Sequence, residues 1–168
     1  MSAPAAAPAA APAAAPAAAP AAQPAAPWWE TTPLERMTRA QWEAVCDGCG
    51  KCCLNKLEDE ETGEIFPTNV ACRLLDRRSA RCGDYANRKA LVPECVRLTP
   101  ARLETIDWLP VTCAYLALWR GERLPDWHHL VCGDREEVHR AGVSVRGWTV
   151  SETDAGELED HIVEGRIV

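Results

Sequence analysis

Four cysteines fall within eight residues, in the segment CDGCGKCC at 46–53. The residues between them are aspartate, glycine and lysine, which do not build an apolar core. Two successive C-x-x-C steps wrap three sulfurs around one centre, as in a ferredoxin-type iron–sulfur run. Structural zinc sites more often use two separated C-x-x-C pairs. The segment therefore predicts a metal centre, and its spacing favours an iron–sulfur cluster over zinc.

The segment departs from a complete ferredoxin run, because Cys53 follows Cys52 directly and no Cys-Pro ending is present. We expect the side chains of this adjacent pair to point apart, so that one of them reaches a second centre. Five more cysteines follow the segment: Cys72, Cys82, Cys95, Cys113 and Cys132. Any one of these taken alone is more often a small buried apolar residue than a ligand.

The number of cysteines helps to decide between disulfides and metal binding, and so between an oxidising and a reducing cell compartment. Nine cysteines are an odd number, which argues against a closed disulfide framework. No basic region followed by a leucine-rich stretch marks a secretory signal, so we expect a cytoplasmic protein. Thiols stay reduced there, and a cysteine pattern indicates metal binding or catalysis.

The first 27 residues consist mostly of alanine, with a proline at every fourth position from Pro4 to Pro24. Proline at that period blocks an α-helix, and the segment could not satisfy its own backbone in lipid. We therefore expect residues 1–27 to be a disordered Ala-Pro arm, and no membrane contact. Residues 28–168 form the predicted cysteine-cluster metal-binding domain. The net charge of -7 argues against nucleic-acid binding.

The sequence of the folded part predicts short helices and short strands. Thr38 begins a capping box that predicts a helix through Val45, which delivers the first cysteine. Residues 54–75 predict a β-hairpin with its turn at 61–64, in which Pro67 demotes the second strand to an edge or interrupts it. Residues 143–150 predict another strand. The fold class predicted is α+β, a small domain of short helices and a hairpin stapled by metal.

A basic stretch lies among the later cysteines: Arg73, Arg77, Arg78, Arg81, Arg88 and Lys89. Four thiolates around Zn²⁺ or a [4Fe–4S]²⁺ core leave about two negative charges. Arginines beside Cys72 and Cys82 could offset that charge, which predicts weaker metal binding in Arg81→Ala. Among the histidines, His128 is the candidate ligand to test.

Short motifs recur in order around the cysteines. They are CDGCGKCC, TNVACRLLD at 68–76, CGDY at 82–85 followed by Arg88, PEC at 93–95, WLPVTCAY at 108–115, LPDWHHL at 124–130 and SVR at 144–146. Over about residues 28–155 the chain resembles the YcgN branch of the YkgJ-type cysteine-cluster family. That family is described as a zinc- or iron-chelating domain, and the resemblance implies a cytoplasmic bacterial metal-binding protein.

Position by position, the resemblance implies a set of eight metal ligands: Cys46, Cys49, Cys52, Cys53, Cys72, Cys82, Cys95 and Cys113. His128 also falls on the family pattern, whereas Cys132 departs from it and is expected to be a bystander. Eight cysteines suit two four-thiolate centres, or one cluster beside a dithiol.

Three functions follow as hypotheses. The first is a cytosolic protein that holds an iron–sulfur cluster or zinc through the cysteines. The second is a cluster-dependent redox or modifying enzyme whose basic stretch binds an anionic substrate. The third is a thiol–disulfide redox protein, although no strand followed by C-x-x-C and a helix supports it. In a metal-handling module, the arm would be a tether to a protein partner.

Overall fold

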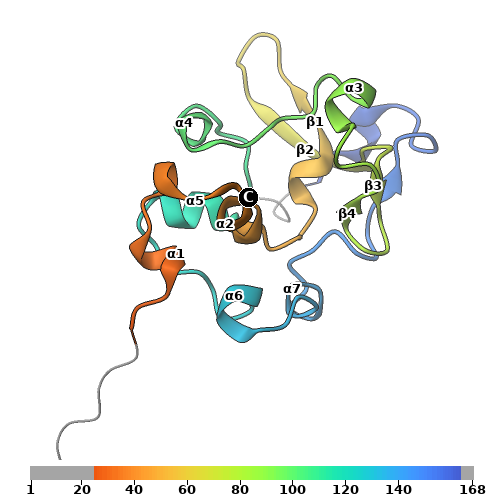
Figure 1. Cartoon of the computed structure of the whole chain (residues 1–168). Coiled ribbons are helices and arrows are strands. Elements are labelled where there is room, and N and C mark those ends of the chain that lie inside the picture. Colours follow the sequence, from red (N-terminus) through yellow and green to blue (C-terminus); the bar gives the residue numbers. More distant parts are fainter. Residues whose placement is uncertain (1–24, 164–168) are drawn as a thin grey trace, which may run out of the picture.

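The computed structural model describes residues 25–163 of the chain, so the predicted arm lies outside the described residues except for its last three. Short helices and two small sheets make up the fold, which confirms the predicted α+β class (Figure 1). The α-helices are α1 Trp28–Thr31, α2 Arg39–Val45, α3 Arg88–Leu91, α4 Pro100–Leu103, α5 Ala114–Trp119, α6 His129–Cys132 and α7 Glu137–Arg140. The 3-10 helices are η1 Leu34–Arg36, η2 Lys51–Cys53 and η3 Leu158–His161. The strands are β1 Leu54–Glu58, β2 Ile65–Ala71, β3 Leu75–Asp76, β4 Arg81–Cys82 and β5 Val150–Ser151.

Two separate apolar cores hold the domain together. The helical core contains Val45 and the buried face of α5, together with Leu103 and Leu109. The sheet core is smaller: Leu54, Ala71, Leu75, Ala80 and Val145. Figure 1 shows α1, α2, α4 and α5 on one side of the molecule and the strands on the other. Residues 46–53 run from α2 to β1, so the cysteine segment connects the two cores.

The predicted hairpin is confirmed, because β1 pairs antiparallel with β2 from Leu54↔Ala71 to Glu58↔Ile65. The expectation for Pro67 is wrong, since β2 is uninterrupted and central in the order β1-β2-β5. The Pro67 carbonyl accepts a hydrogen bond from the Val163 N–H (2.9 Å), on the edge of β2 that faces away from β1. The missing proline N–H therefore removes no bond from the hairpin ladder.

The strand predicted over 143–150 is also wrong, since only its last residue joins β5, which pairs in parallel with β2. The backbone N–H of Val145 donates instead to the Cys49 carbonyl (2.9 Å). Gly147 has φ +84°, which breaks an extended run. This stretch therefore anchors the cysteine loop rather than extending the sheet.

Within residues 25–163, no helix is long and apolar enough to cross a membrane.

Candidate metal centre

Helix α2 places Cys46. The Gln41 N–H donates to Thr38 Oγ1 (3.2 Å) and the Thr38 N–H donates to Gln41 Oε1 (2.9 Å), which is the predicted capping box. The helix ends at Val45, and Cys46 follows as its C-cap in extended conformation. The capping box thus fixes where α2 begins, and Cys46 follows directly after its last residue.

A helix from much later in the chain places Cys113, which is the N-cap of α5. The rings of Trp42 on α2 and Tyr115 on α5 lie 4.5 Å apart between centroids. The Tyr115 hydroxyl also donates to the Trp42 carbonyl (3.0 Å). This packing holds the end of α2 and the start of α5 together, and so brings Cys113 toward Cys46.

The loop between α2 and η2 turns tightly. Gly48 and Gly50 both have φ near +80°, which L-residues rarely adopt. A Cβ on Gly50 would lie 2.7 Å from Val145 Cγ2, so the loop packs directly on the sheet core. Asp47 Oδ1 accepts from the Cys49 N–H (2.9 Å), which closes an Asx turn between two cysteines.

Four thiols lie within electrostatic reach of one another, and we name them the first cysteine group: Cys46, Cys49, Cys52 and Cys113. Burial raises the pKa of Cys46 and Cys49, and raises that of Cys113 to about 11. The negative charge of Asp47 raises the pKa of all three thiols further. Without a cation these thiols are protonated at neutral pH.

The remaining patterned cysteines meet on the sheet side. The Cys72 N–H donates to the Cys53 carbonyl (2.9 Å), and pairing of β3 with β4 puts Cys82 opposite Leu75. Burial raises the pKa of Cys72, and the charges of Glu152, Cys82 and Cys95 raise it further. We name this set the second cysteine group: Cys53, Cys72, Cys82 and Cys95.

The two groups adjoin at the Cys52–Cys53 step. The Sγ atoms of Cys52 and Cys53 lie 4.0 Å apart, so the expectation that these side chains point apart is wrong. The interaction with Cys53 is the main cause that raises the pKa of Cys52. Lys56 lies beside both thiols: burial lowers its pKa, whereas their charges raise it. Its Nζ donates to the Leu54 carbonyl (2.8 Å) and lies 4.5 Å from the Trp108 ring centroid.

Charge compensation by arginines at Cys72 and Cys82 stays a prediction. Arg73 instead pairs with Glu152 (3.3 Å) and donates to the Leu91 carbonyl, which ties the segment before Cys95 to the end of β2. Among the described residues, no arginine donates a hydrogen bond to a cysteine sulfur. The sequence interpretation missed Lys56, whose position two residues into β1 gave no sign of its burial beside the thiols.

His128 is fully buried, and both of its ring nitrogens bond to backbone. Nδ1 accepts from the Leu130 N–H (3.1 Å), so Nε2 carries the proton and donates to the Val45 carbonyl (2.9 Å). Burial lowers the pKa of His128, which keeps the ring neutral. The ring therefore braces the end of α2 next to Cys46 and presents no free nitrogen to a metal.

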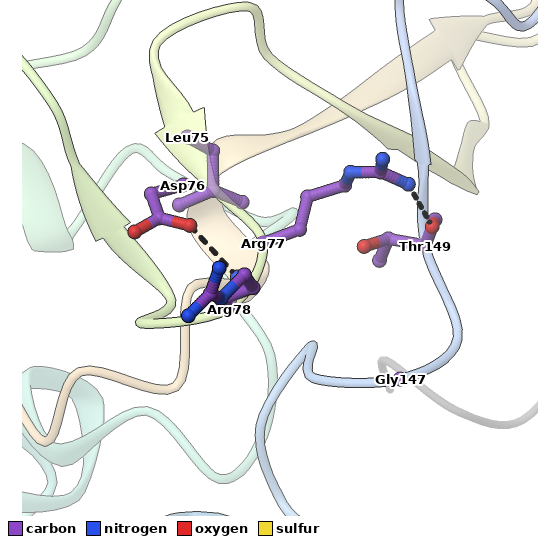
Figure 2. A pocket seen from close by; sticks show the side chains of 6 residues that line it. All are labelled: Leu75, Asp76, Arg77, Arg78, Gly147 and Thr149. Carbon is purple, nitrogen blue, oxygen red and sulfur yellow. Dashed lines mark hydrogen bonds between the residues drawn. The ribbon is translucent and has the colours of Figure 1, made fainter.

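A pocket lies over the basic stretch (Figure 2). Its lining residues are Leu75, Asp76, Arg77, Arg78, Gly147 and Thr149. Arg77 Nη1 donates to the Thr149 carbonyl (2.8 Å), and Asp76 Oδ1 accepts from the Arg78 N–H (2.9 Å). None of the six is a cysteine, although Leu75 pairs with Cys82 of the second cysteine group across the β3–β4 ladder.

The donor chemistry fits zinc or iron, because thiolate is the preferred ligand of both in proteins. Within residues 25–163, no three side chains of Cys, His, Asp and Glu are already arranged to hold a metal ion. Cys132 is exposed, and its sulfur bonds only to backbone atoms of neighbouring residues.

The comparisons with known proteins name the same two metals. Residues 45–114 match the family model CxxCxxCC, described as a "putative zinc- or iron-chelating domain". A UPF0260 protein of Rhizorhabdus wittichii is 67% identical over 141 residues, which cover 84% of this chain and 97% of that protein. The chain belongs to the UPF0260 family. Other members are 57% identical in Granulibacter bethesdensis (82% of each chain covered) and 56% in a Caulobacter species (80% and 83%).

No solved structure matches the chain. The family match confirms the cysteine-cluster family predicted from the motifs, and the names of the UPF0260 relatives state no activity. The sequence interpretation also overlooked Asp47, although an Asp-Gly step between two cysteines signals a turn whose carboxylate faces inward.

Proposed function

We propose that this protein chelates zinc or iron through the two cysteine groups, with one metal centre in each. The observation that supports the proposal is that cysteines from separate segments lie close enough for their charges to interact, in two sets that adjoin where the Cys52 and Cys53 sulfurs lie 4.0 Å apart. A chain that merely buries small apolar residues has no reason to gather thiols beside Asp47 and Lys56, because charged groups do not build a core.

Metal binding at these groups is coupled to proton release. The raised pKa values of Cys46, Cys49 and Cys113 mean that the ion displaces protons from thiols that are otherwise neutral. The ion also draws the thiols of a group together, so that the helical core and the sheet core become linked through residues 46–53. We therefore expect metal to stabilise the whole domain. A cytoplasmic location, where thiols stay reduced, suits this function.

The identity of the metal is the finer part of the proposal. The consecutive C-x-x-C-x-x-C spacing of Cys46, Cys49 and Cys52 supports an iron–sulfur cluster. The carboxylate of Asp47 among the same thiols supports a single divalent ion, because zinc accepts sulfur and carboxylate oxygen together. Acid-labile sulfide separates these two cases.

The test is to measure zinc, iron and acid-labile sulfide per chain on the full chain, expressed with both metals supplied and purified without oxygen. We expect metal in every folded molecule, and Cys132→Ser to bind as much as the unchanged protein. Sulfide in proportion to iron identifies a cluster, which makes a cluster-dependent redox or modifying enzyme the next hypothesis. Zinc or iron without sulfide identifies a chelating site.

A folded protein that takes up neither metal refutes the proposal. The Cys52 sulfur, 4.0 Å from that of Cys53, would then support the thiol–disulfide alternative, since two neighbouring thiols can form a disulfide. Mass spectrometry after thiol alkylation distinguishes that case.

A further inference from the structure

Asp47 is a buried carboxylate whose second oxygen has no partner. The residue is only 5% exposed, in the turn between Cys46 and Cys49. Oδ1 accepts from the Cys49 N–H, whereas Oδ2 is buried and accepts no hydrogen bond from any described residue. Among residues 25–163, no lysine, arginine or histidine forms an ion pair with it.

A buried carboxylate oxygen without a partner is costly, and buried carboxylates in proteins are paired, hydrogen-bonded or bound to metal. Water has little access to Oδ2 here, so a cation is the group that would offset its charge. The nearest sulfur ligands belong to the same loop. Cys49 and Cys113 are as sheltered as Asp47, at 7% and 9% exposed, and Cys46 is half-buried.

Cys52 differs from the other members of the first cysteine group. The residue is exposed as a whole, and its sulfur lies 4.0 Å from the sulfur of Cys53 in the second cysteine group. Four thiolates around a divalent ion leave about two negative charges, and an unbound Asp47 beside them would add a third. Three thiolates and one carboxylate leave only about two, with Cys52 as a neutral thiol.

We propose that Asp47 Oδ2 is an oxygen donor to a single divalent zinc or iron ion in the first cysteine group. Its partners in the ligand shell are the thiolates of Cys46, Cys49 and Cys113, and Cys52 stays outside that shell. This rests on the proposed function, because it needs a metal at the first group. It replaces the cluster favoured by the C-x-x-C-x-x-C spacing with a mixed sulfur and oxygen site.

The test compares Asp47→Asn with Asp59→Asn in the zinc-loaded full chain. Asparagine keeps the Oδ1 acceptor for the Cys49 N–H but loses the anionic donor. Asp59 is the matched control, because its Oδ1 caps the Glu61 N–H (2.9 Å) in a similar turn of the exposed hairpin loop. We expect Asp47→Asn to weaken zinc about tenfold or more in competition with a chromophoric chelator. Asp59→Asn should stay within about twofold of the unchanged protein, and Cys52→Ser should weaken zinc less than Asp47→Asn does.

X-ray absorption at the zinc edge of the unchanged protein gives a second readout that does not depend on a variant folding. Besides sulfur at about 2.3 Å, we expect about one oxygen donor per two zinc ions at about 2.0–2.2 Å. A shell of sulfur alone overturns the inference, and so does equal zinc affinity in the two Asp→Asn variants. Both results leave the proposed function standing, whereas a chain that binds neither zinc nor iron refutes the proposed function itself.

Discussion

The two hydrogen bonds of His128 carry the most specific structural prediction. His128→Ala leaves the Val45 carbonyl and the Leu130 N–H without partners at a site that is closed to water. Each unsatisfied backbone group costs about 1–3 kcal/mol, so the loss of both partners should lower the free energy of unfolding by roughly 2–6 kcal/mol. That is a large share of the roughly 5–15 kcal/mol that stabilises an ordinary domain.

His128→Gln should recover part of this loss. Its amide nitrogen occupies the place of the imidazole Nε2 and can still donate to the Val45 carbonyl, so about 1–2 kcal/mol should return. Urea unfolding of the metal-free chain measures both variants. His161→Ala is the control, because His161 also bonds through both ring nitrogens, to Asn69 and to the Ala155 carbonyl, away from α2.

Metal affinity shows whether His128 positions Cys46 specifically or only stabilises the fold in general. Because His128 holds the end of α2 that carries Cys46, its variants should weaken metal at the first cysteine group, whereas His161→Ala should not. A loss below about 1 kcal/mol in His128→Ala would refute this reasoning, and so would a glutamine variant no more stable than the alanine variant.

Three further perturbations follow from the same structure. Thr38→Ala removes the capping box of α2 and should cost about 1 kcal/mol in thermal unfolding; an unchanged melting temperature would contradict it. Gly50→Ala should destabilise much more than Gly63→Ala: both glycines have positive φ, but only at Gly50 does the new Cβ meet Val145. Burial lowers the pKa of His129 from 6.5 to about 4, so the unfolded chain takes up its proton first. Its contribution to stability is full above pH 6.5 and falls as the pH drops toward 4; urea unfolding across that range should show a weaker slope in His129→Gln.

Local patterns predicted the parts of the fold that depend on neighbours in sequence. The Thr38 capping box and the 54–75 hairpin could be predicted because their hydrogen bonds join residues within one short, continuous segment. The strand expected over 143–150 failed because the Val145 N–H bonds to the cysteine loop, a contact that periodicity does not reveal.

The cysteine motif predicted the kind of site but not its grouping. Cys113 joins Cys46 only because Trp42 packs on Tyr115 across 73 residues of sequence. His128 followed the ligand pattern, yet its two nitrogens are taken by backbone groups from α2 and α6. Such assignments depend on tertiary packing, which spacing alone does not encode.

The most direct test of the account is the metal content per chain of Cys113→Ser and Cys95→Ser, beside the unchanged protein and Cys132→Ser. The account predicts that each of the first two variants loses one centre and keeps the other, because their sulfurs belong to different cysteine groups. Cys132→Ser should lose none. If either Cys113→Ser or Cys95→Ser empties both centres while the chain stays folded, the division into two metal centres is contradicted.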